Sequence, residues 1–387
     1  MAKAHIQIKD HSDCCGCRAC ESKCPPKCII MKSDALGFRY PEVDESKCIS
    51  CRACIAACPI INQCNSRNPI KQFAAKNTCN DDRLKSSSGG IFIALAQYII
   101  RKGGVVFGAV FDRNWTVYHR AAETMDEVYK MMGSKYIQSD TRHTFLEARE
   151  YLKQGRKVLY TGTPCQISGL KHFLKTDYPD LFTVEVICHG VPSPKVWLSY
   201  LNERMMLEPH DTNNIDSISF RDKKDSWKKY RISIKKGSDT INEPFPLNDY
   251  MQVFLRNWSL RPSCFKCRAK SGTSQADITI GDFWGIDNLD IMNDDDKGIS
   301  CIICRSQKGI NLIYGCDQLK LAQTNYQTIL KNNLSLENSA EYSNDAYRFQ
   351  KLFPSKGFYE TKRLIENPPF YYKIIRSIKY RFRNIFT

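Results

Sequence analysis

One cysteine pattern occurs twice near the start of the chain, and it constrains the fold more than any other feature. Each copy has the spacing C-x2-C-x2-C-x3-C-P. The first copy comprises Cys14, Cys17, Cys20 and Cys24, followed by Pro25, and the second comprises Cys48, Cys51, Cys54 and Cys58, followed by Pro59. This spacing is typical of bacterial ferredoxins with two [4Fe–4S] clusters, in which the fourth cysteine of each run ligates the other cluster.

The crossed ligation has a steric reason. Three thiolates on a tight loop can face three corners of one cubane, but a fourth cysteine so close in sequence cannot complete it. We therefore assign Cys14, Cys17, Cys20 and Cys58 to one cluster, and Cys48, Cys51, Cys54 and Cys24 to the other. A zinc site needs no such exchange between two runs. A disulfide framework suits a small secreted domain, and we find no secretory signal at the N-terminus.

The charge of the chain indicates its partners. The net charge is +16 over 387 residues, with basic runs at Arg221–Lys236 and after Lys351. Such a balance favours an acidic electron carrier or redox partner subunit and an anionic small-molecule acceptor. We recognise no nucleic-acid-binding module, so we expect no nucleic-acid partner. The longest apolar stretch, Ile91–Ile100, is too short to cross a membrane, and we expect a cytoplasmic protein.

Hydrophobic periodicity predicts alternating helices and strands after the cysteine repeats. The segments are a helix within 85–104 that starts in serines and glycines, a strand at 105–111, a helix at 144–153, a strand at 157–166, a helix at 167–175 and a strand at 183–194. This alternation indicates an α/β core. The fold class is therefore α+β, with an N-terminal two-cluster ferredoxin fold, a mixed α/β core and a basic helical tail.

These patterns divide the chain into three parts. We expect a ferredoxin domain at 1–65, ending in the linker Asn65–Pro69, and a C-terminal extension at 336–387. The core between them covers 70–335 and has an N-part, 70–155, and a C-part, 156–335.

Four later cysteines form a candidate third metal site. Cys165 and Cys188 each follow a predicted buried strand, and the carboxyl ends of strands are where open α/β sheets bind ligands. With Cys264 and Cys267 they could hold a third [4Fe–4S] cluster. The alternative is that the first two are small buried side chains and the last two a zinc half-site. Cys301 and Cys304 lie within one predicted strand and point to opposite faces, so we interpret them as core residues.

Ser86–Gly90 opens a predicted helix and is a candidate phosphate site, because backbone N–H groups and the helix dipole favour an anion there. Serine acting only as a helix cap is the alternative. Gly133–Tyr136 and Thr161–Pro164 could add donors, but no complete G-x-G-x-x-G motif or P-loop is present. His189, beside Cys188, is either a proton donor or a polar contact.

Together these loops carry a family resemblance. The motifs, in order, are KSSSGGIF, GSKYIQS, TGTPCQISGL, ICHGVPSP, SFRDKK, LRPSCFKC and ITIGDFWG. The chain resembles the coenzyme F420 hydrogenase/dehydrogenase beta-subunit family, in its form with a fused N-terminal two-cluster ferredoxin. The resemblance covers roughly residues 1–320 and leaves the C-terminal segment unexplained.

This resemblance implies a flavin, FAD, bound in the core and a nearby third cluster held by the four later cysteines. The implied flavin contacts are Ser87, Ser88, Gly89, Gly90, Ser134, Lys135, Thr161, Gly162 and Thr163. It also implies an oxidoreductase that passes electrons between a one-electron donor and a two-electron acceptor, such as coenzyme F420 or another small organic substrate. The competing hypothesis is a non-catalytic electron-transfer subunit of a larger complex.

The last residues, 368–387, predict a basic amphipathic helix. Two interpretations remain open: the apolar face docks on the protein itself, or it lies on an anionic membrane, which would place the protein at the inner membrane face.

Overall fold

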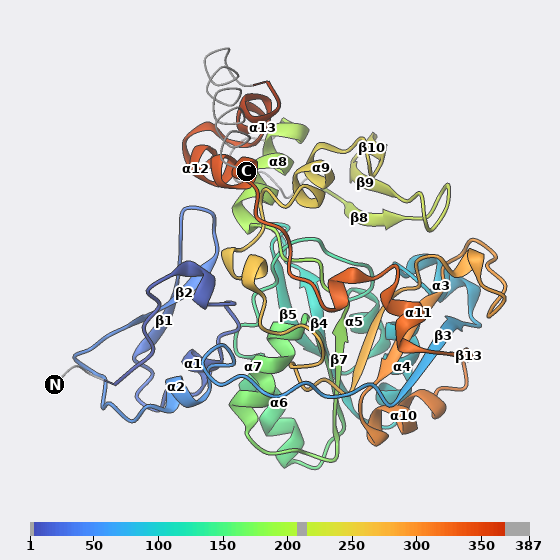
Figure 1. The fold of residues 1–387 in the computed structure, drawn as a ribbon, viewed down its shortest axis with the longest axis horizontal. Coiled ribbons are helices and arrows are strands. Elements are labelled where there is room, and N and C mark those ends of the chain that lie inside the picture. Colours follow the sequence, from blue (N-terminus) through green and yellow to red (C-terminus); the bar gives the residue numbers. More distant parts are fainter. Residues whose placement is uncertain (1–3, 207–214, 368–387) are drawn as a thin grey trace, which may run out of the picture.

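The N-terminal repeat of the sequence is also a repeat of the backbone. The computed structural model describes residues 4–206 and 215–367 (Figure 1). The first part holds an antiparallel pair, β1 (Ile29–Ser33) and β2 (Arg39–Val43), and two one-turn helices, α1 (Ala19–Ser22) and α2 (Ala53–Ala56). The residues before these helices, Arg18 and Arg52, are both left-handed, with φ of 62° and 60°. The two cysteine runs therefore fold in the same way.

An eight-stranded sheet forms the centre of the molecule, in the order β13-β3-β12-β11-β7-β6-β4-β5. Its strands are β3 (Lys71–Asn77), β4 (Val105–Phe111), β5 (Val117–Ala122), β6 (Val158–Gly162), β7 (Leu181–Val186), β11 (Ile278–Asp282), β12 (Ser300–Cys304) and β13 (Leu319–Thr324). Strands β4, β6, β7 and β11 run parallel, and the outer neighbours are antiparallel. The carboxyl ends of β6, β7 and β11 therefore meet the start of β12 at one edge.

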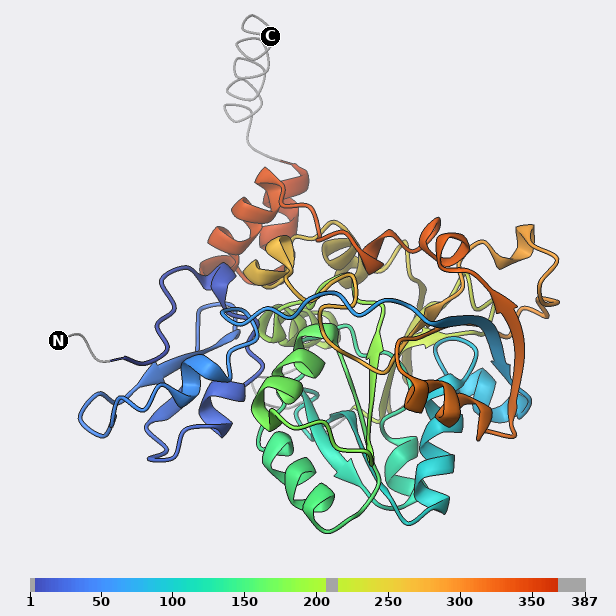
Figure 2. The same ribbon diagram turned by 60° about the horizontal axis from the view of Figure 1, so that its bottom comes forward.

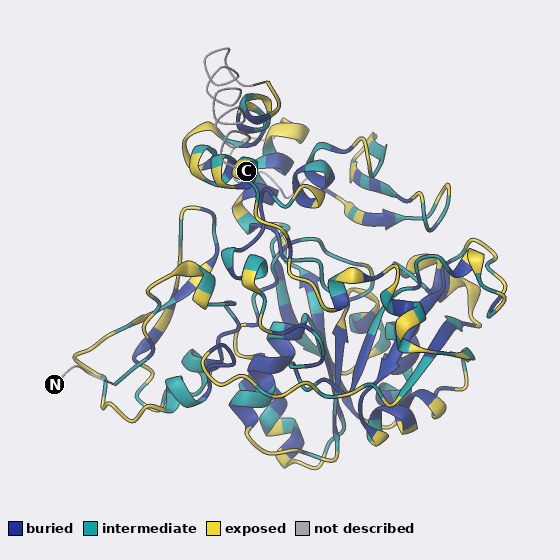
Figure 3. Cartoon of the chain, viewed as in Figure 1, coloured by how far each residue is buried: buried dark blue, intermediate teal, exposed yellow. Residues whose placement is uncertain are grey.

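Helices cover both faces of this sheet (Figures 2 and 3). On one face lie α6 (Thr144–Lys153) and α7 (Pro164–Leu174); on the other lie α4 (Ile91–Arg101), α5 (Met125–Tyr129) and α10 (Gln307–Tyr314). Alternate strand residues face opposite layers, so that Phe107 packs with α6 and α7, and Val106 with α4. The predicted mixed α/β architecture is confirmed.

A second layer of structure lies above the sheet in Figure 1. It consists of α8 (Pro194–Met205), β8 (Ser217–Asp222), β9 (Arg231–Lys236), β10 (Asp239–Pro244), α9 (Asp249–Leu255), α12 (Asn344–Lys356) and α13 (Phe358–Glu366). Its core is aromatic, with Trp197, Tyr200 and Tyr250 fully buried. We predicted a C-terminal extension but not α12 and α13 within it.

The start of α4 differs from the prediction. A separate helix, α3 (Asn80–Lys85), ends before the serines, and α4 begins only at Ile91. The residue that precedes α4 is Gly90, with φ of 80°, and no side chain caps the helix. Serine is therefore not the helix cap here, and Ser86–Gly90 is a loop. The first-turn N–H groups of α4 have no capping side chain.

The segment that joins the cysteine repeats to the sheet is held along its length. The Arg67 N–H donates to the Gly272 carbonyl at 3.1 Å, and the Ile70 N–H donates to the Cys304 carbonyl at 2.8 Å. The Arg305 guanidinium donates to the Arg67 carbonyl at 2.6 Å. We call residues 65–70 the strap.

Two predictions concern membranes. The predicted tail helix, 368–387, lies outside the described residues. Within the described part of the chain, no helix has the length and apolar content needed to span a bilayer.

Candidate functional site

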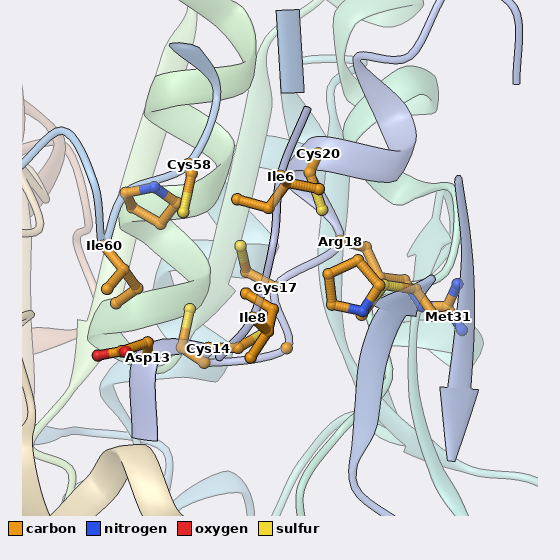
Figure 4. A pocket seen from close by; sticks show the side chains of 14 residues that line it. Ile6, Ile8, Asp13, Cys14, Cys17, Arg18, Cys20, Met31, Cys58 and Ile60 are labelled. Carbon is orange, nitrogen blue, oxygen red and sulfur yellow. The ribbon is translucent and has the colours of Figure 1, made fainter. Parts of the chain in front are cut away.

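The first cysteine pocket gathers the residues that we assigned to one cluster. Cys14, Cys17 and Cys20 line a pocket together with Cys58 from the second run (Figure 4). Apolar side chains complete its wall, among them Ile6, Ile8, Met31 and Ile60. Figure 4 shows the four thiols around this space. The pocket has the crossed cysteine set and the apolar surroundings that a [4Fe–4S] cluster requires.

A second pocket repeats this arrangement. Cys24 from the first run joins Cys48, Cys51 and Cys54 in the lining of this pocket. Its lining residues lie between positions 4 and 54. Cys28 also reaches this pocket, with its sulfur 3.4 Å from that of Cys24. The second pocket is closer to solvent, because Cys51 is exposed.

Burial acts against thiolate formation in these pockets. Burial raises the pKa of Cys20, and it also raises the pKa of Cys54 and Cys58. Buried thiols of this kind become ligands only when a cation stabilises the thiolate, as iron does. Among the residues described, no group of three or more His, Cys, Asp or Glu side chains could hold a single metal ion.

The four later cysteines come from three loops at the carboxyl edge of the sheet. Cys165 is the second residue of α7, Cys188 follows β7, and Cys264 lies in the 3₁₀ turn Pro262–Lys266, before Cys267. Burial raises the pKa of Cys188 to about 12. Burial also raises the pKa of Cys264, and the charges of Cys188, Cys165 and Cys267 raise it further. Negative charge on the neighbouring cysteines thus acts in the same direction as burial on the pKa of Cys264.

Backbone contacts fix this convergence. Pro192 and Leu260 form an antiparallel bridge between the two loops that carry Cys188 and Cys264. The Val191 N–H donates to the Cys264 sulfur at 3.4 Å, a contact that favours a thiolate. All four cysteines are partly buried, and a third cluster held by them stays a prediction.

Cys15 connects the first pocket with this third cysteine group, and its position was not predicted. Its side chain is buried and lies within hydrogen-bonding reach of both Cys17 and Cys165. The Cys15 thiol and burial together raise the pKa of Cys165. Because Cys15 lacks ligand spacing, no signal in the sequence marks this position.

The loop Ser86–Gly90 lies against two cationic side chains that were not predicted as site residues. The Arg221 guanidinium donates to the Ser87 carbonyl at 3.0 Å, and the Lys223 ammonium to the Ser88 carbonyl at 2.6 Å. The Ser134 N–H donates to the Ser87 hydroxyl at 2.7 Å. Ser87, Ser88 and Ser134 therefore do come together. Their two cationic partners both come from the basic run that starts at Arg221.

The positive charges of Arg221 and Lys223 are compensated to different degrees. Arg221 is buried, and burial would lower its pKa, but Asp282 at 2.9 Å raises it. Lys223 donates to three backbone carbonyls, and burial together with the charge of Arg221 lowers its pKa to about 7. A poorly compensated ammonium beside an uncapped helix start favours an anionic ligand.

The glycines of this loop serve its packing. A Cβ on Gly89 would lie 2.6 Å from the Ala75 carbonyl oxygen and 2.7 Å from the Ser300 nitrogen. The Gly89 N–H donates to the Ser300 hydroxyl at 2.9 Å. Gly89 therefore lets the loop pack closely against β3 and β12. In a phosphate site, the glycine would instead let a ligand come close to the backbone.

The remaining predicted flavin contacts form a second group beside Cys165. The Thr161 hydroxyl donates to the Phe107 carbonyl at 2.9 Å, and the Thr163 hydroxyl lies 3.2 Å from the Cys165 sulfur. Gly162 packs against the Gln166 side chain. Within the described part of the chain, we find no hydrogen bond that links this group to Ser87 or Ser88.

Lys135 and His189 both point to protein partners. The Lys135 ammonium donates to the carbonyls of residues 131–133 at 3.0–3.1 Å, and burial lowers its pKa to about 7. The His189 imidazole lies 2.6 Å from the Asn257 side-chain oxygen, with its ring edge-on to Phe254. Burial lowers the pKa of His189 below its ordinary value. Its catalytic role stays a prediction.

Comparison with known proteins agrees with these features. The family model for the C-terminal region of the coenzyme F420 hydrogenase/dehydrogenase beta subunit matches residues 155–326, and the 4Fe-4S binding domain family matches residues 41–60. The coenzyme F420-dependent sulfite reductase of Methanocaldococcus jannaschii is 23% identical over 307 residues, covering 78% of this chain and 46% of that protein. This chain thus spans about half the length of that curated relative.

A structural relative is found in the F420-reducing [NiFe] hydrogenase complex from Methanosarcina barkeri, solved as a xenon derivative. One of its chains superposes with a TM-score of 0.46 and 18% sequence identity, covering 66% of this chain and 82% of that chain.

Proposed function

We propose that this chain, a member of the coenzyme F420 hydrogenase/dehydrogenase beta-subunit family through residues 155–326, is an iron–sulfur flavoprotein oxidoreductase. It would move electrons between a one-electron donor and a two-electron acceptor, such as coenzyme F420 or another small organic molecule. The observation that carries this proposal is the placement of cysteine groups and a cationic loop along one edge of the sheet.

The cysteines supply three metal sites in this proposal. Each of the two N-terminal pockets would hold one [4Fe–4S] cluster through its crossed cysteine set. Cys165, Cys188, Cys264 and Cys267 would hold a third. In the first pocket, where burial raises the pKa of Cys20 and Cys58, a cationic cluster would stabilise the thiolate form of these ligands.

The cationic loop supplies the flavin site. Arg221 and Lys223 would bind the phosphates of FAD beside the start of α4, with Ser87, Ser88 and Ser134 as hydroxyl and amide donors. From β12 to β6 is three strand spacings, about 14 Å, which suits an extended dinucleotide that also reaches Thr161–Thr163. Bound flavin stores two electrons and exchanges them singly with clusters or as a hydride with the acceptor.

A second candidate function rests on chain length. The curated relative is about twice as long as the region matched here. Its additional part could hold the substrate chemistry, in which case this chain would be an electron-transfer subunit that serves a separate catalytic partner.

Anaerobic reconstitution of the full chain tests the proposal. We expect about twelve iron atoms and one FAD per chain, and about eight iron atoms after replacement of Cys264 and Cys267 by serine. A matched C301S/C304S variant, altered only at β12, should keep the full iron content. A chain that binds no flavin at full iron content would refute the flavoprotein assignment.

Turnover by the isolated chain separates the two candidate functions. With a reduced one-electron donor and oxidised coenzyme F420, an enzyme should bleach the deazaflavin absorbance. A loaded chain that reduces its own FAD but leaves the deazaflavin oxidised would support the subunit hypothesis.

A further inference from the structure

A buried arginine lies between the first cysteine pocket and the third cysteine group. Arg261 is fully buried, and its guanidinium donates to the Cys14 carbonyl at 2.8 Å, to the Gln138 side-chain oxygen at 2.9 Å and to the Arg39 carbonyl at 2.9 Å. The Tyr40 ring centre lies 4.4 Å from the guanidinium carbon. One residue therefore connects β2, the first cysteine loop and the loop that carries Cys264.

None of these acceptors is an anion. Within residues 4–206 and 215–367, no carboxylate forms an ion pair with Arg261. An isolated buried charge is strongly unfavourable unless an opposite charge compensates it. Burial would lower the pKa of Arg261, but Cys14, Tyr40, Cys15 and Cys264 raise it. The positive charge of Arg261 is thus compensated by anionic sulfur on both sides, from the first cysteine loop and from the loop that carries Cys264.

The backbone makes room for this charge. Gly16 has φ of 72°, and a Cβ there would lie 2.8 Å from a terminal guanidinium nitrogen. The glycine between Cys15 and Cys17 therefore allows the cation to lie directly on the cysteine loop.

The two N-terminal pockets differ in how they face the core. The Cys17 carbonyl accepts a hydrogen bond from the Thr141 hydroxyl at 3.0 Å, and a Cβ on Gly169 of α7 would lie 2.8 Å from the Cys17 sulfur. The second pocket instead exposes Cys51, beside Ile49, which is 65% exposed. The first pocket therefore faces the third cysteine group, and the second faces solvent.

We propose that Arg261 is a shared counter-charge for the first and third clusters, raising the reduction potential of both and making the first cluster the one that exchanges electrons with the core. This inference rests on the proposed function. Reduction of either cluster by one electron adds one negative charge, which the fixed cation favours. Arg261 stays protonated throughout, and the electrons come from the donor already proposed.

An EPR-monitored redox titration of the reconstituted chain tests this role. In R261Q we expect the reduction potentials of the first and third clusters to fall by about 59 mV or more. For a one-electron couple, this shift is a tenfold change in the oxidised-to-reduced ratio at a given solution potential. The second cluster should keep its potential and serves as the internal reference. R261K keeps the charge and should stay close to the unaltered chain.

A second variant tests the effect of the Arg261 charge on the cluster potentials while the arginine stays in place. Q138E puts a carboxylate beside the guanidinium and should lower the same two potentials, even if R261Q fails to fold. R256Q removes an arginine that forms a surface ion pair with Glu366, and it should change none of the three reduction potentials.

Three results would each contradict the inference: unchanged potentials at full iron content in both R261Q and Q138E, an equal shift of all three clusters, or a fall in R261K as large as in R261Q. An iron content near eight without a third signal would instead count against the proposed function. Arg261 would then still be tested on the first cluster alone.

Discussion

At the level of single residues, Cys58 distinguishes crossed from uncrossed ligation. It belongs to the second cysteine run but lines the first pocket, with Cys14, Cys17 and Cys20. Sequence proximity would place it with Cys48 instead. Its partner in the exchange, Cys24, lines the second pocket.

We expect C58A to lose the same EPR signal as C14A, with about four fewer iron atoms per chain. C48A should lose the other signal. C316A, altered at a buried cysteine of the core, should keep both. If C58A matched C48A, ligation would be uncrossed.

If FAD binds at this loop as proposed, Lys223 should make its affinity depend on pH. Its folded pKa is about 7 because burial and Arg221 oppose the charged form. A bound phosphate would favour the ammonium and raise this pKa again. Above pH 7, binding must therefore take up a proton.

The affinity for FAD should fall as pH rises above about 7, by up to tenfold per pH unit for this one proton. K223M should bind FAD more weakly at pH 7, and its FAD affinity should change less steeply with pH, because the proton of Lys223 is missing. The proton of Lys135 can still contribute to the pH dependence. The exposed neighbouring variant K224M should keep the full slope. Fluorescence titrations between pH 6 and 9 measure this, and equal slopes in K223M and K224M would exclude Lys223.

Among the elements, the loop between α3 and α4 depends on its contact with β3 and β12. Gly89 lies between the Ala75 carbonyl and Ser300, where both neighbours are backbone or hydroxyl atoms of the sheet. A methyl group there must displace either the loop or a strand.

G89A should lower the stability of the chain by roughly 3 kcal/mol and weaken FAD binding. G155A is a matched control, because its added Cβ meets no atom within 4 Å and costs only about 1 kcal/mol for the left-handed backbone. Thermal midpoints of the two variants provide the comparison. A G89A midpoint above that of G155A would contradict the packing argument.

The bounds of the helices and strands also show which features could be predicted from the sequence. The helix Thr144–Lys153 and the strand 105–111 agree with their predicted bounds, because their periodicity is local. The predicted start of α4 was wrong, since the left-handed Gly90, rather than a serine, precedes the helix. Arg261 and Arg221 could not be foreseen as site residues: Arg261 meets Cys14 across 247 positions, and Arg221 meets Ser87 across 134. Contacts at such separations follow only from the sheet order.

For the whole molecule, charged contacts hold the cysteine repeats on the core. Arg18 pairs with Asp140 and with Glu21, and Arg39 also reaches Asp140 at 3.3 Å. Burial would raise the pKa of Asp140, but Arg18 lowers it. The ion pair therefore stabilises the structure above the ordinary carboxyl pKa, and this contribution is lost as pH falls through the lowered value.

D140N should weaken this docking by about 2 kcal/mol, because it removes one of the two carboxylates that pair with the buried Arg18, while Asp140 itself is partly exposed. Amide hydrogen exchange should accelerate in 15–20 and in 138–142, with the iron content unchanged. E150Q, on the exposed side of α6, is the control. Unchanged exchange in D140N would show that other contacts are sufficient.

The strap gives the molecule a property that separate electron carriers lack. Residues 65–70 are hydrogen-bonded to the turn at Gly272 and to β12. In the proposed electron path, the N-terminal clusters would therefore stay at a constant separation from the core. A tethered carrier that had to swing between docking positions would slow down in glycerol. Here the internal transfer step should proceed at the same rate in viscous and in dilute solution, leaving only the encounter with outside partners subject to diffusion.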